Sequence, residues 1–203
     1  MERLLTFSTR LERLSTLVGR VCAWAIVLLV AVIVTDVLLR RWFIIGSTKL
    51  QELEWHLHGF LFLMCLGWAY TRNAHVRIEL VSDRLRARTR AWIELTGCLL
   101  FLLPYVAAVL VFGYDYVSYS FAYGEASASP TGLPYRWIIK SAIVAGFGLL
   151  GIAAMAKALA ALVFLFGRDE LAAQTGFSRH GSHQASASGS SNGSEQDLAG
   201  GAS

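Results

Sequence analysis

The chain has 203 residues, of which 55% are hydrophobic and 16% are charged, and its mean hydropathy is +0.51. Soluble domains carry more charge and less apolar surface, so this composition excludes an ordinary soluble protein and indicates a membrane protein. The apolar runs are continuous rather than alternating, which favours membrane-spanning helices of roughly 20 residues over a β-barrel.

The polar ends of the chain are predicted to lie outside the membrane. Residues 1–19 are too polar to cross it, yet apolar side chains recur there at helical spacing with arginines on the other faces. The apolar positions are Leu4, Phe7, Leu11, Leu14 and Val18. This pattern predicts an amphipathic helix on the cytoplasmic membrane surface. Residues 168–203 are rich in Ser and Gly and are expected to be disordered, with no part in transport chemistry.

Four apolar runs lie between these ends and predict an all-α, four-helix membrane domain over residues 20–167. The runs cover residues 21–39, 55–71, 92–114 and 138–159. The first run is followed by no small-residue cleavage pattern and is expected to remain as an anchor. The second is short for a hydrocarbon core of about 30 Å, so its helix is expected to begin near Leu50 or Glu52. Pro104 is expected to kink the third helix.

The distribution of Lys and Arg predicts which side of the membrane each loop occupies, because cytoplasmic loops carry the excess of these residues. The segment before the first run and the loop after the second are strongly basic. Their arginines are Arg3, Arg10, Arg13, Arg20, Arg72, Arg77, Arg84, Arg86, Arg88 and Arg90. Both termini are therefore predicted to be cytoplasmic. This topology accounts for the pI of about 9.1 without a nucleic-acid-binding surface.

The sequence carries no strong signal for catalysis, a metal or a cofactor. Cys22 and two further cysteines lie on three separate runs without the C-x-x-C spacing of redox or metal sites. A haem would need inward-facing axial ligands at suitable depth. His56 and His58 lie together at one end of the second run, and His75 lies beyond the other end. The chain is therefore predicted not to be an enzyme.

Ionisable residues at the edges of the runs are the best functional candidates, because a charge in hydrocarbon is costly and usually needs a partner. Asp36 and Arg40 are four residues apart and can pair on one helix face, and Glu54 and His58 have the same spacing. These residues either form a polar cluster that docks a partner subunit, or neutralise one another and extend towards water.

The centres of the runs lack the features of a complete carrier. Coupled transporters usually bind substrate and ions at mid-membrane, on broken helices within repeated halves. The run centres here contain no carboxylate, Asn or Gln, and no pair of interrupted hairpins is apparent. Transport by this chain alone is therefore not expected.

Several short motifs occur in the order typical of one transporter family. They are residues 36–41 (DVLLRR), 51–55 (QELEW), 66–70 (LGWAY), 75–79 (HVRIE) and 131–137 (TGLPYRW). Over about residues 18–165, the chain resembles the small, DctQ-type permease subunit of tripartite ATP-independent periplasmic (TRAP) transporters. The four-span layout of that family agrees with the four runs counted from hydropathy.

The resemblance implies a subunit of the bacterial inner membrane that works with two partners. A large, DctM-type membrane subunit carries the substrate and sodium sites in this family, and a periplasmic substrate-binding protein delivers the substrate. The small subunit is implied to be a scaffold for the large one and to help dock the binding protein during sodium-coupled uptake of a small organic acid.

The same resemblance suggests roles for particular side chains. The candidates for partner contacts are Asp36, Arg40, Glu54, His58 and Arg136, and the candidates for ordering the cytoplasmic loop are His75, Arg77 and Glu79. Small residues of the fourth run would permit close contact with a partner, or would pack inside this chain. They are Gly146, Gly148, Gly151, Ala153 and Ala154. Two other functions stay open, a self-assembling small carrier or channel and the membrane anchor of a redox enzyme.

Overall fold

The computed structural model describes residues 2–44, 46–72 and 87–166, and the regular elements in these ranges are all helical. In chain order they are α1 (Glu2–Ala23), α2 (Ala25–Trp42), α3 (Thr48–Thr71), α5 (Ala87–Gly97), the π-helical turn η1 (Cys98–Leu102), α6 (Leu103–Ala122) and α7 (Trp137–Phe166). The all-α prediction is confirmed for this part of the chain. The predicted loop residues His75, Arg77 and Glu79 and the predicted disordered tail lie outside the described residues.

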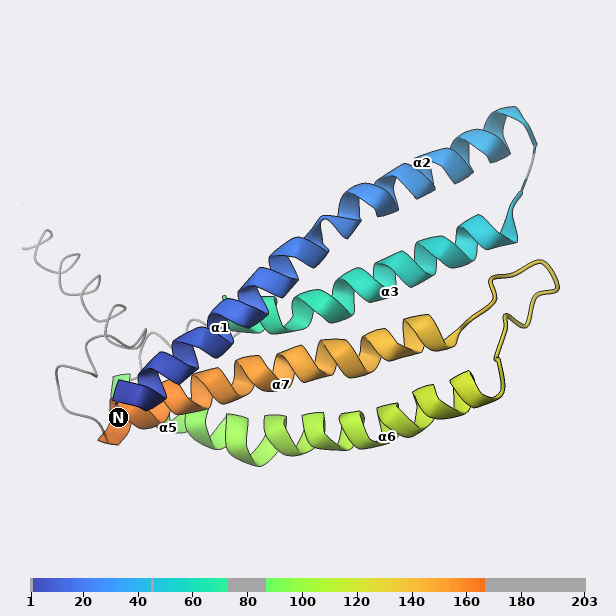
Figure 1. The fold of residues 1–203 in the computed structure, drawn as a ribbon. Helices are drawn as coiled ribbons and strands as arrows, with labels where there is room; N and C mark the ends of the chain where they lie inside the picture. Colours follow the sequence, from blue (N-terminus) through green and yellow to red (C-terminus); the bar gives the residue numbers. More distant parts are fainter. Residues whose placement is uncertain (1, 45, 73–86, 167–203) are drawn as a thin grey trace, which may run out of the picture.

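Helices α2, α3, α7 and α6 lie side by side in that order, and α3 and α7 run in the same direction at the centre (Figure 1). The end of α2, the start of α3 and residues 123–136 lie at one end of the bundle, which we call the connector end. The opposite end, where α1 begins and α7 ends, is the terminal end. Helix α1 packs against both α3 and α7 near the terminal end.

Helix α1 joins the bundle through small residues rather than through its large apolar ones. The Ser8 hydroxyl donates to the backbone oxygen of Ala156 on α7 at 2.8 Å, and Gly19 lies directly against Trp68 of α3. The large residues Leu4 and Phe7 are exposed. Small side chains let two helix backbones approach closely, which explains why they face the bundle. The position of α1 at a membrane surface stays a prediction.

Glycines bring α3 and α7 into backbone contact. A Cβ atom on Gly146 of α7 would lie 2.5 Å from the backbone oxygen of Leu63, and one on Gly67 of α3 would lie 2.8 Å from the backbone oxygen of Leu149. The two contacts are about one helical turn apart, and each helix contributes one glycine. The side chains at these positions are absent because the partner backbone occupies their space.

The small residues of α7 were predicted either to contact a partner or to pack inside this chain, and the structure distinguishes the five positions. Ala153 and Ala154 are buried within the chain, and Gly146 and Gly151 face α3 and α6. Gly148 has no atom within 4 Å of an added Cβ. Packing inside the chain therefore accounts for four of the five positions, and Gly148 alone faces open space.

Three helical segments are long and apolar enough to cross a membrane, within the residues that the structure describes. They cover residues 3–42, 88–122 and 137–166 and contain the first, third and fourth predicted runs. Helix α3 is not among them, because polar residues, including Glu54, His56 and His58, lower the hydropathy of its first half. The predicted fourth span and the predicted orientation stay predictions.

The third predicted run contains a backbone irregularity next to its proline. The π-helical turn Cys98–Leu102 precedes Pro104, and the backbone N–H of Leu103 donates to the oxygen of Cys98. A proline has no N–H to continue an α-helical ladder, and a single π-helical turn is a common way of absorbing such a break. The structure thus shows a π-helical turn beside Pro104, and a kink of the helix axis there stays a prediction.

The outer helices expose much of their apolar surface. Helix α2 buries only Leu29 and Asp36 and packs mainly against α3. Its exposed side chains include Ile26, Val27, Leu28, Val30, Val34 and Val37. On α6 they include Val111, Phe112 and Tyr114. Exposed apolar surface of this extent is typical of contact with lipid or with another membrane subunit.

Candidate functional site

A buried carboxylate, Glu52, fastens the 123–136 connection to α3 at the connector end. Its carboxylate accepts a hydrogen bond from the backbone N–H of Leu133 at 2.7 Å and another from the Ser127 hydroxyl. Thr131 and Thr48 add a hydroxyl contact at 3.3 Å. We call the Glu52–Ser127–Leu133 group the connector latch. It joins residues about 80 positions apart in the sequence.

Local sequence positions both halves of the latch. Ser47 caps α3 by accepting from the N–H of Leu50 at 3.4 Å, so the helix starts at Thr48 and Glu52 lies one turn further on. In the connection, a Cβ on Gly132 would lie 2.7 Å from the Glu52 carboxylate. Only glycine fits there, which gives the TGLPYRW motif a structural role.

The same connection is tied to the start of α7 by an ion pair. Lys140 pairs with Glu125, and its ammonium group lies 3.8 Å from the centre of the Tyr116 ring. The backbone N–H of Arg136 donates to the oxygen of Glu125 at 3.0 Å. The connection is therefore anchored to α3, α6 and α7.

Hydrogen bonds lower the pKa of two carboxylates at the connector end, Glu52 on α3 and Glu125 in the connection. The Leu133 N–H, followed by the Ser127 hydroxyl, holds the pKa of Glu52 below its usual range. The hydrogen bond from Lys140 holds the pKa of Glu125 below its usual range. The positive charge of Arg136 contributes to lowering the pKa of both groups. Both carboxylates are therefore ionised at neutral pH.

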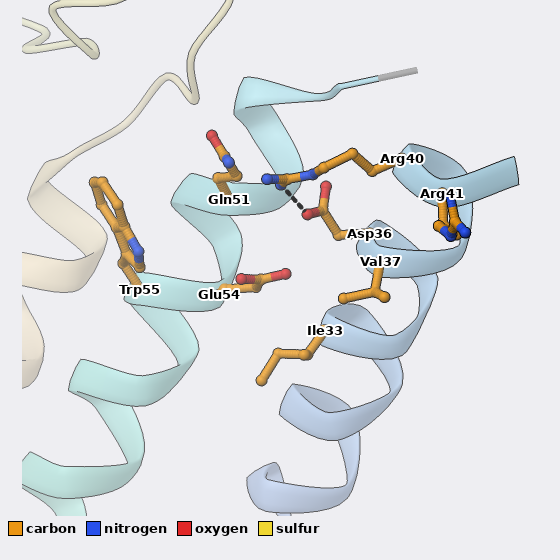
Figure 2. Close-up of a pocket in the computed structure, with 8 residues that line it drawn as sticks. All are labelled: Ile33, Asp36, Val37, Arg40, Arg41, Gln51, Glu54 and Trp55. Atoms are coloured by element: carbon orange, nitrogen blue, oxygen red, sulfur yellow. Dashed lines mark hydrogen bonds and ion pairs between the residues drawn. The ribbon is translucent and has the colours of Figure 1, made fainter. Parts of the chain in front are cut away.

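A second feature of the connector end is an open cavity of about 500 Å³ between α2 and α3 (Figure 2). Its lining residues are Ile33, Asp36, Val37, Arg40, Arg41, Gln51, Glu54 and Trp55. Asp36 is only 2% exposed and accepts from the half-exposed guanidinium of Arg40. The predicted Asp36–Arg40 pair is thus confirmed.

The structure separates the predicted contact residues into two groups. Asp36, Arg40 and Glu54 line the α2–α3 cavity, whereas Arg136 lies beside the connector latch. His58 is exposed one turn beyond Glu54, and no hydrogen bond or ion pair joins the two in the described part of the chain. Whether any of these residues contacts a partner stays a prediction.

Sequence reasoning did not single out the residues that organise the connector end. Glu52 lay within the quoted QELEW motif, but its main partner is the backbone N–H of Leu133, which has no side-chain signature. Glu125 and Lys140 are fifteen positions apart, so no helical spacing links them. The sequence signal that could have indicated this contact was the presence of both QELEW and TGLPYRW, since the structure brings these two motifs together.

The terminal end has its own buried polar group. The Tyr70 hydroxyl donates to the Glu94 carboxylate at 3.0 Å and lies 2.8 Å from the Cys98 sulfur. Side chains of α3, α5 and η1 are joined in this way. No group of three His, Cys, Asp or Glu side chains suited to a metal ion occurs among residues 2–44, 46–72 and 87–166.

Comparison with known families decides the identity of the chain. The sequence model for tripartite ATP-independent periplasmic transporters, DctQ component, matches residues 29–164. The chain belongs to the DctQ family. The match covers more than half of the chain, including the connector latch and the α2–α3 cavity. No curated protein matches the chain.

Membership makes this protein the small membrane subunit of a TRAP transporter. The DctQ family is a family of transporter subunits and not of enzymes. DctQ components belong to tripartite systems, which implies a second membrane subunit and a periplasmic binding protein as partners.

Proposed function

We propose that this DctQ subunit is a fixed scaffold that crosses the bacterial inner membrane four times, with both termini in the cytoplasm. It holds a large DctM-type subunit and presents its connector end to the periplasmic substrate-binding protein. The observation that carries the proposal is the polar connection at the connector end, which hydrogen bonds and an ion pair anchor to the helices. The helices that it joins carry no charged side chain in their central parts.

Regular spacing of charges supports α3 as the fourth span. Arg20 and Arg40 are 20 residues apart along α1 and α2, a distance of about 30 Å at 1.5 Å per residue, which equals one hydrocarbon thickness. Glu54 of α3 and Arg72, which directly follows that helix, are 18 residues apart, or about 27 Å. Glu54 shares the connector-end cavity with Arg40, and Arg72 shares a terminal-end cavity with Arg20. Helix α3 therefore covers the same depth as the segment from Arg20 to Arg40 of α1 and α2.

The uncharged interior supports a scaffold whose transport sites lie in its partner. Residues 25–35, 59–70, 95–114 and 141–156 contain no Asp, Glu, Lys, Arg or His. Ion and substrate sites at mid-membrane need such groups or broken helices. Sodium coupling and a small organic acid as substrate follow from the family resemblance, with both sites in the DctM-type subunit.

The anchored connection supports a docking role because it presents exposed aromatic side chains on a fixed backbone. Tyr123 and Tyr135 are both more than 60% exposed. Tyrosines on a preorganised surface are frequent energetic centres of protein interfaces, since little entropy is lost when they bind. We assign this surface to the binding protein.

Cysteine labelling tests the orientation. In intact cells, an Ala128→Cys variant should react with a membrane-impermeant maleimide added from outside, because residue 128 is exposed in the connection. The unsubstituted chain is the control, since Cys22, Cys65 and Cys98 lie within helices. Labelling of the variant only after the inner membrane is opened would overturn the proposed topology.

Reconstituted transport tests the docking role. Proteoliposomes containing this chain and its large partner should lose uptake in a Tyr123→Ala variant at limiting binding protein, and excess binding protein should restore it. The matched control is Tyr114→Ala, which removes an equally exposed tyrosine from the membrane-facing part of α6. Equal uptake by both variants would contradict the docking role. Uptake by this chain without its partner would contradict the scaffold.

A further inference from the structure

A second cavity, of about 570 Å³, lies between α1 and α3 towards the terminal end. Its lining residues are Thr9, Glu12, Arg13, Thr16, Leu17, Arg20, Thr71 and Arg72. Three guanidinium groups and one carboxylate give the cavity an excess of positive charge. Neither the connector latch nor the proposed docking role uses these residues.

The positive side chains are directed to one place by the helices that carry them. Arg13 and Arg20 are seven residues apart on α1 and therefore share a face, and Arg72 follows the last residue of α3. None of the three guanidinium groups forms an ion pair with a carboxylate in the described part of the chain. Among the described residues, no carboxylate competes with an anionic ligand for these groups by an ion pair.

The three threonine hydroxyl groups of the cavity differ in whether they already donate a hydrogen bond within the chain. Thr9 donates to the backbone oxygen of Thr6 at 2.9 Å, and Thr71 donates to that of Trp68 at 2.8 Å. Thr16 makes no hydrogen bond with a described residue and is half-buried in the wall of the cavity. Thr16 can thus donate to a ligand oxygen beside Arg13 and Arg20.

The depth of the cavity matches that of lipid phosphates. Arg20 lies about 30 Å from Arg40 along the helix, so it marks the boundary between hydrocarbon and headgroups at the terminal end. Apolar surface continues from the cavity into the hydrocarbon, because Leu17, Val21 and Trp24 are all exposed along the same helical run. A ligand held here would have its charged part on the arginines and an apolar part along α1.

We propose that this cavity binds the phosphate group of an anionic phospholipid, with the acyl chains lying along Leu17, Val21 and Trp24. Guanidinium groups bind phosphate oxygens through paired hydrogen bonds, and basic cavities beside membrane helices favour anionic headgroups. The apolar path distinguishes a lipid from free phosphate as the source of the anion. The inference requires only that the chain lies in a membrane, and so it does not depend on the docking role.

Lipid counting on the purified membrane complex tests the proposal. The complex would be delipidated in detergent and titrated with phosphatidylglycerol or phosphatidylcholine, and bound lipids would be counted by native mass spectrometry. The test variant is Arg13→Gln/Arg20→Gln/Arg72→Gln. The matched control, Arg3→Gln/Arg10→Gln/Arg88→Gln, removes the same charge from exposed positions outside the cavity.

The unsubstituted complex and the control should bind phosphatidylglycerol equally and in preference to phosphatidylcholine. Each basic residue contributes about fivefold to the affinity for anionic lipid, so the test variant should bind roughly 100-fold more weakly. A Glu12→Gln variant should bind more tightly, because it removes the one carboxylate of the cavity. A gain in affinity cannot arise from misfolding, so this variant keeps the test decisive if the triple variant is unstable.

Three results would overturn the proposal. Equal phosphatidylglycerol binding by the test and control variants would place the lipid elsewhere. Equal occupancy by inorganic phosphate at millimolar concentration, without a dependence on lipid, would make free phosphate the ligand. Loss of the large partner subunit from the test variant with an unchanged lipid count would make the cavity a protein contact.

Discussion

Replacing Gly146 with alanine tests whether the α3–α7 backbone contact holds the bundle together. The added Cβ would lie 2.5 Å from the backbone oxygen of Leu63 and 2.8 Å from its carbonyl carbon. These are backbone atoms of a packed helix, so they cannot rotate away as the end of a side chain could. Overpacking of this kind costs about 1–3 kcal/mol.

Gly148 provides the matched control on the same helix. An added Cβ there meets no atom within 4 Å. Both substitutions gain the same intrinsic helix preference of alanine over glycine, about 1 kcal/mol, so this contribution cancels in the comparison. Gly146→Ala should therefore be less stable than Gly148→Ala by about 2 kcal/mol, or about 4–8 °C in melting temperature for a chain of this size.

The measurement is thermal unfolding of the full-length chain in a mild detergent, followed by the loss of monodisperse protein on size-exclusion chromatography. Both variants would be compared with the unsubstituted chain under identical conditions. Equal melting temperatures for Gly146→Ala and Gly148→Ala would refute the reasoning, because they would mean that α3 and α7 separate without cost at this contact.

Three further predictions concern the polar groups at the two ends of the bundle. Glu52→Gln should increase hydrogen exchange at the amide of Leu133 at neutral pH, whereas Glu54→Gln should not, because only Glu52 accepts from that amide. The pKa of Glu52 is lower in the folded state than its ordinary value of 4.5, so the stabilisation from Glu52 is fully present above pH 4.5 and is lost as the pH falls through the folded-state pKa. In the unsubstituted chain, the protection factor at the Leu133 amide should therefore stay constant from neutral pH to about pH 5 and decrease when the pH falls below 4.5. The Glu52→Gln variant should show no such decrease. Tyr70→Phe should destabilise the chain by about 1–3 kcal/mol through loss of the hydroxyl that bonds a buried carboxylate, while the exposed control Tyr114→Phe should change its melting temperature little.

The helices were predictable from the sequence because continuous apolar runs determine helical spans directly. The Asp36–Arg40 pair was predictable for a similar reason, since residues four apart share a helix face whatever the tertiary structure. Residue spacing alone did not establish the Glu54–His58 pair, because the same four-residue spacing permits a contact without requiring one.

The connector latch and the close helix contacts could not be predicted, because they depend on how distant elements meet. Glu52 bonds a backbone amide 81 positions away, which leaves no side-chain pattern in the sequence. Gly146 and Gly148 look equivalent in the sequence, and only the rotation of α7 against α3 distinguishes them. The faces of α1 were similarly hidden, since its small residues pack on the bundle and Leu4 and Phe7 do not.

Helix α3, which is less apolar than α2, α6 and α7, connects the features of the molecule. It packs against α1, α2 and α7, its first turns line the connector-end cavity and carry Glu52, and its last residues line the basic cavity. A helix that packs on neighbours along much of its length exposes less of its surface to lipid, so it can carry charges near its end at lower cost than an outer helix such as α2. The glycine contact with α7 permits the central position of α3, because it lets the two helix backbones approach closely.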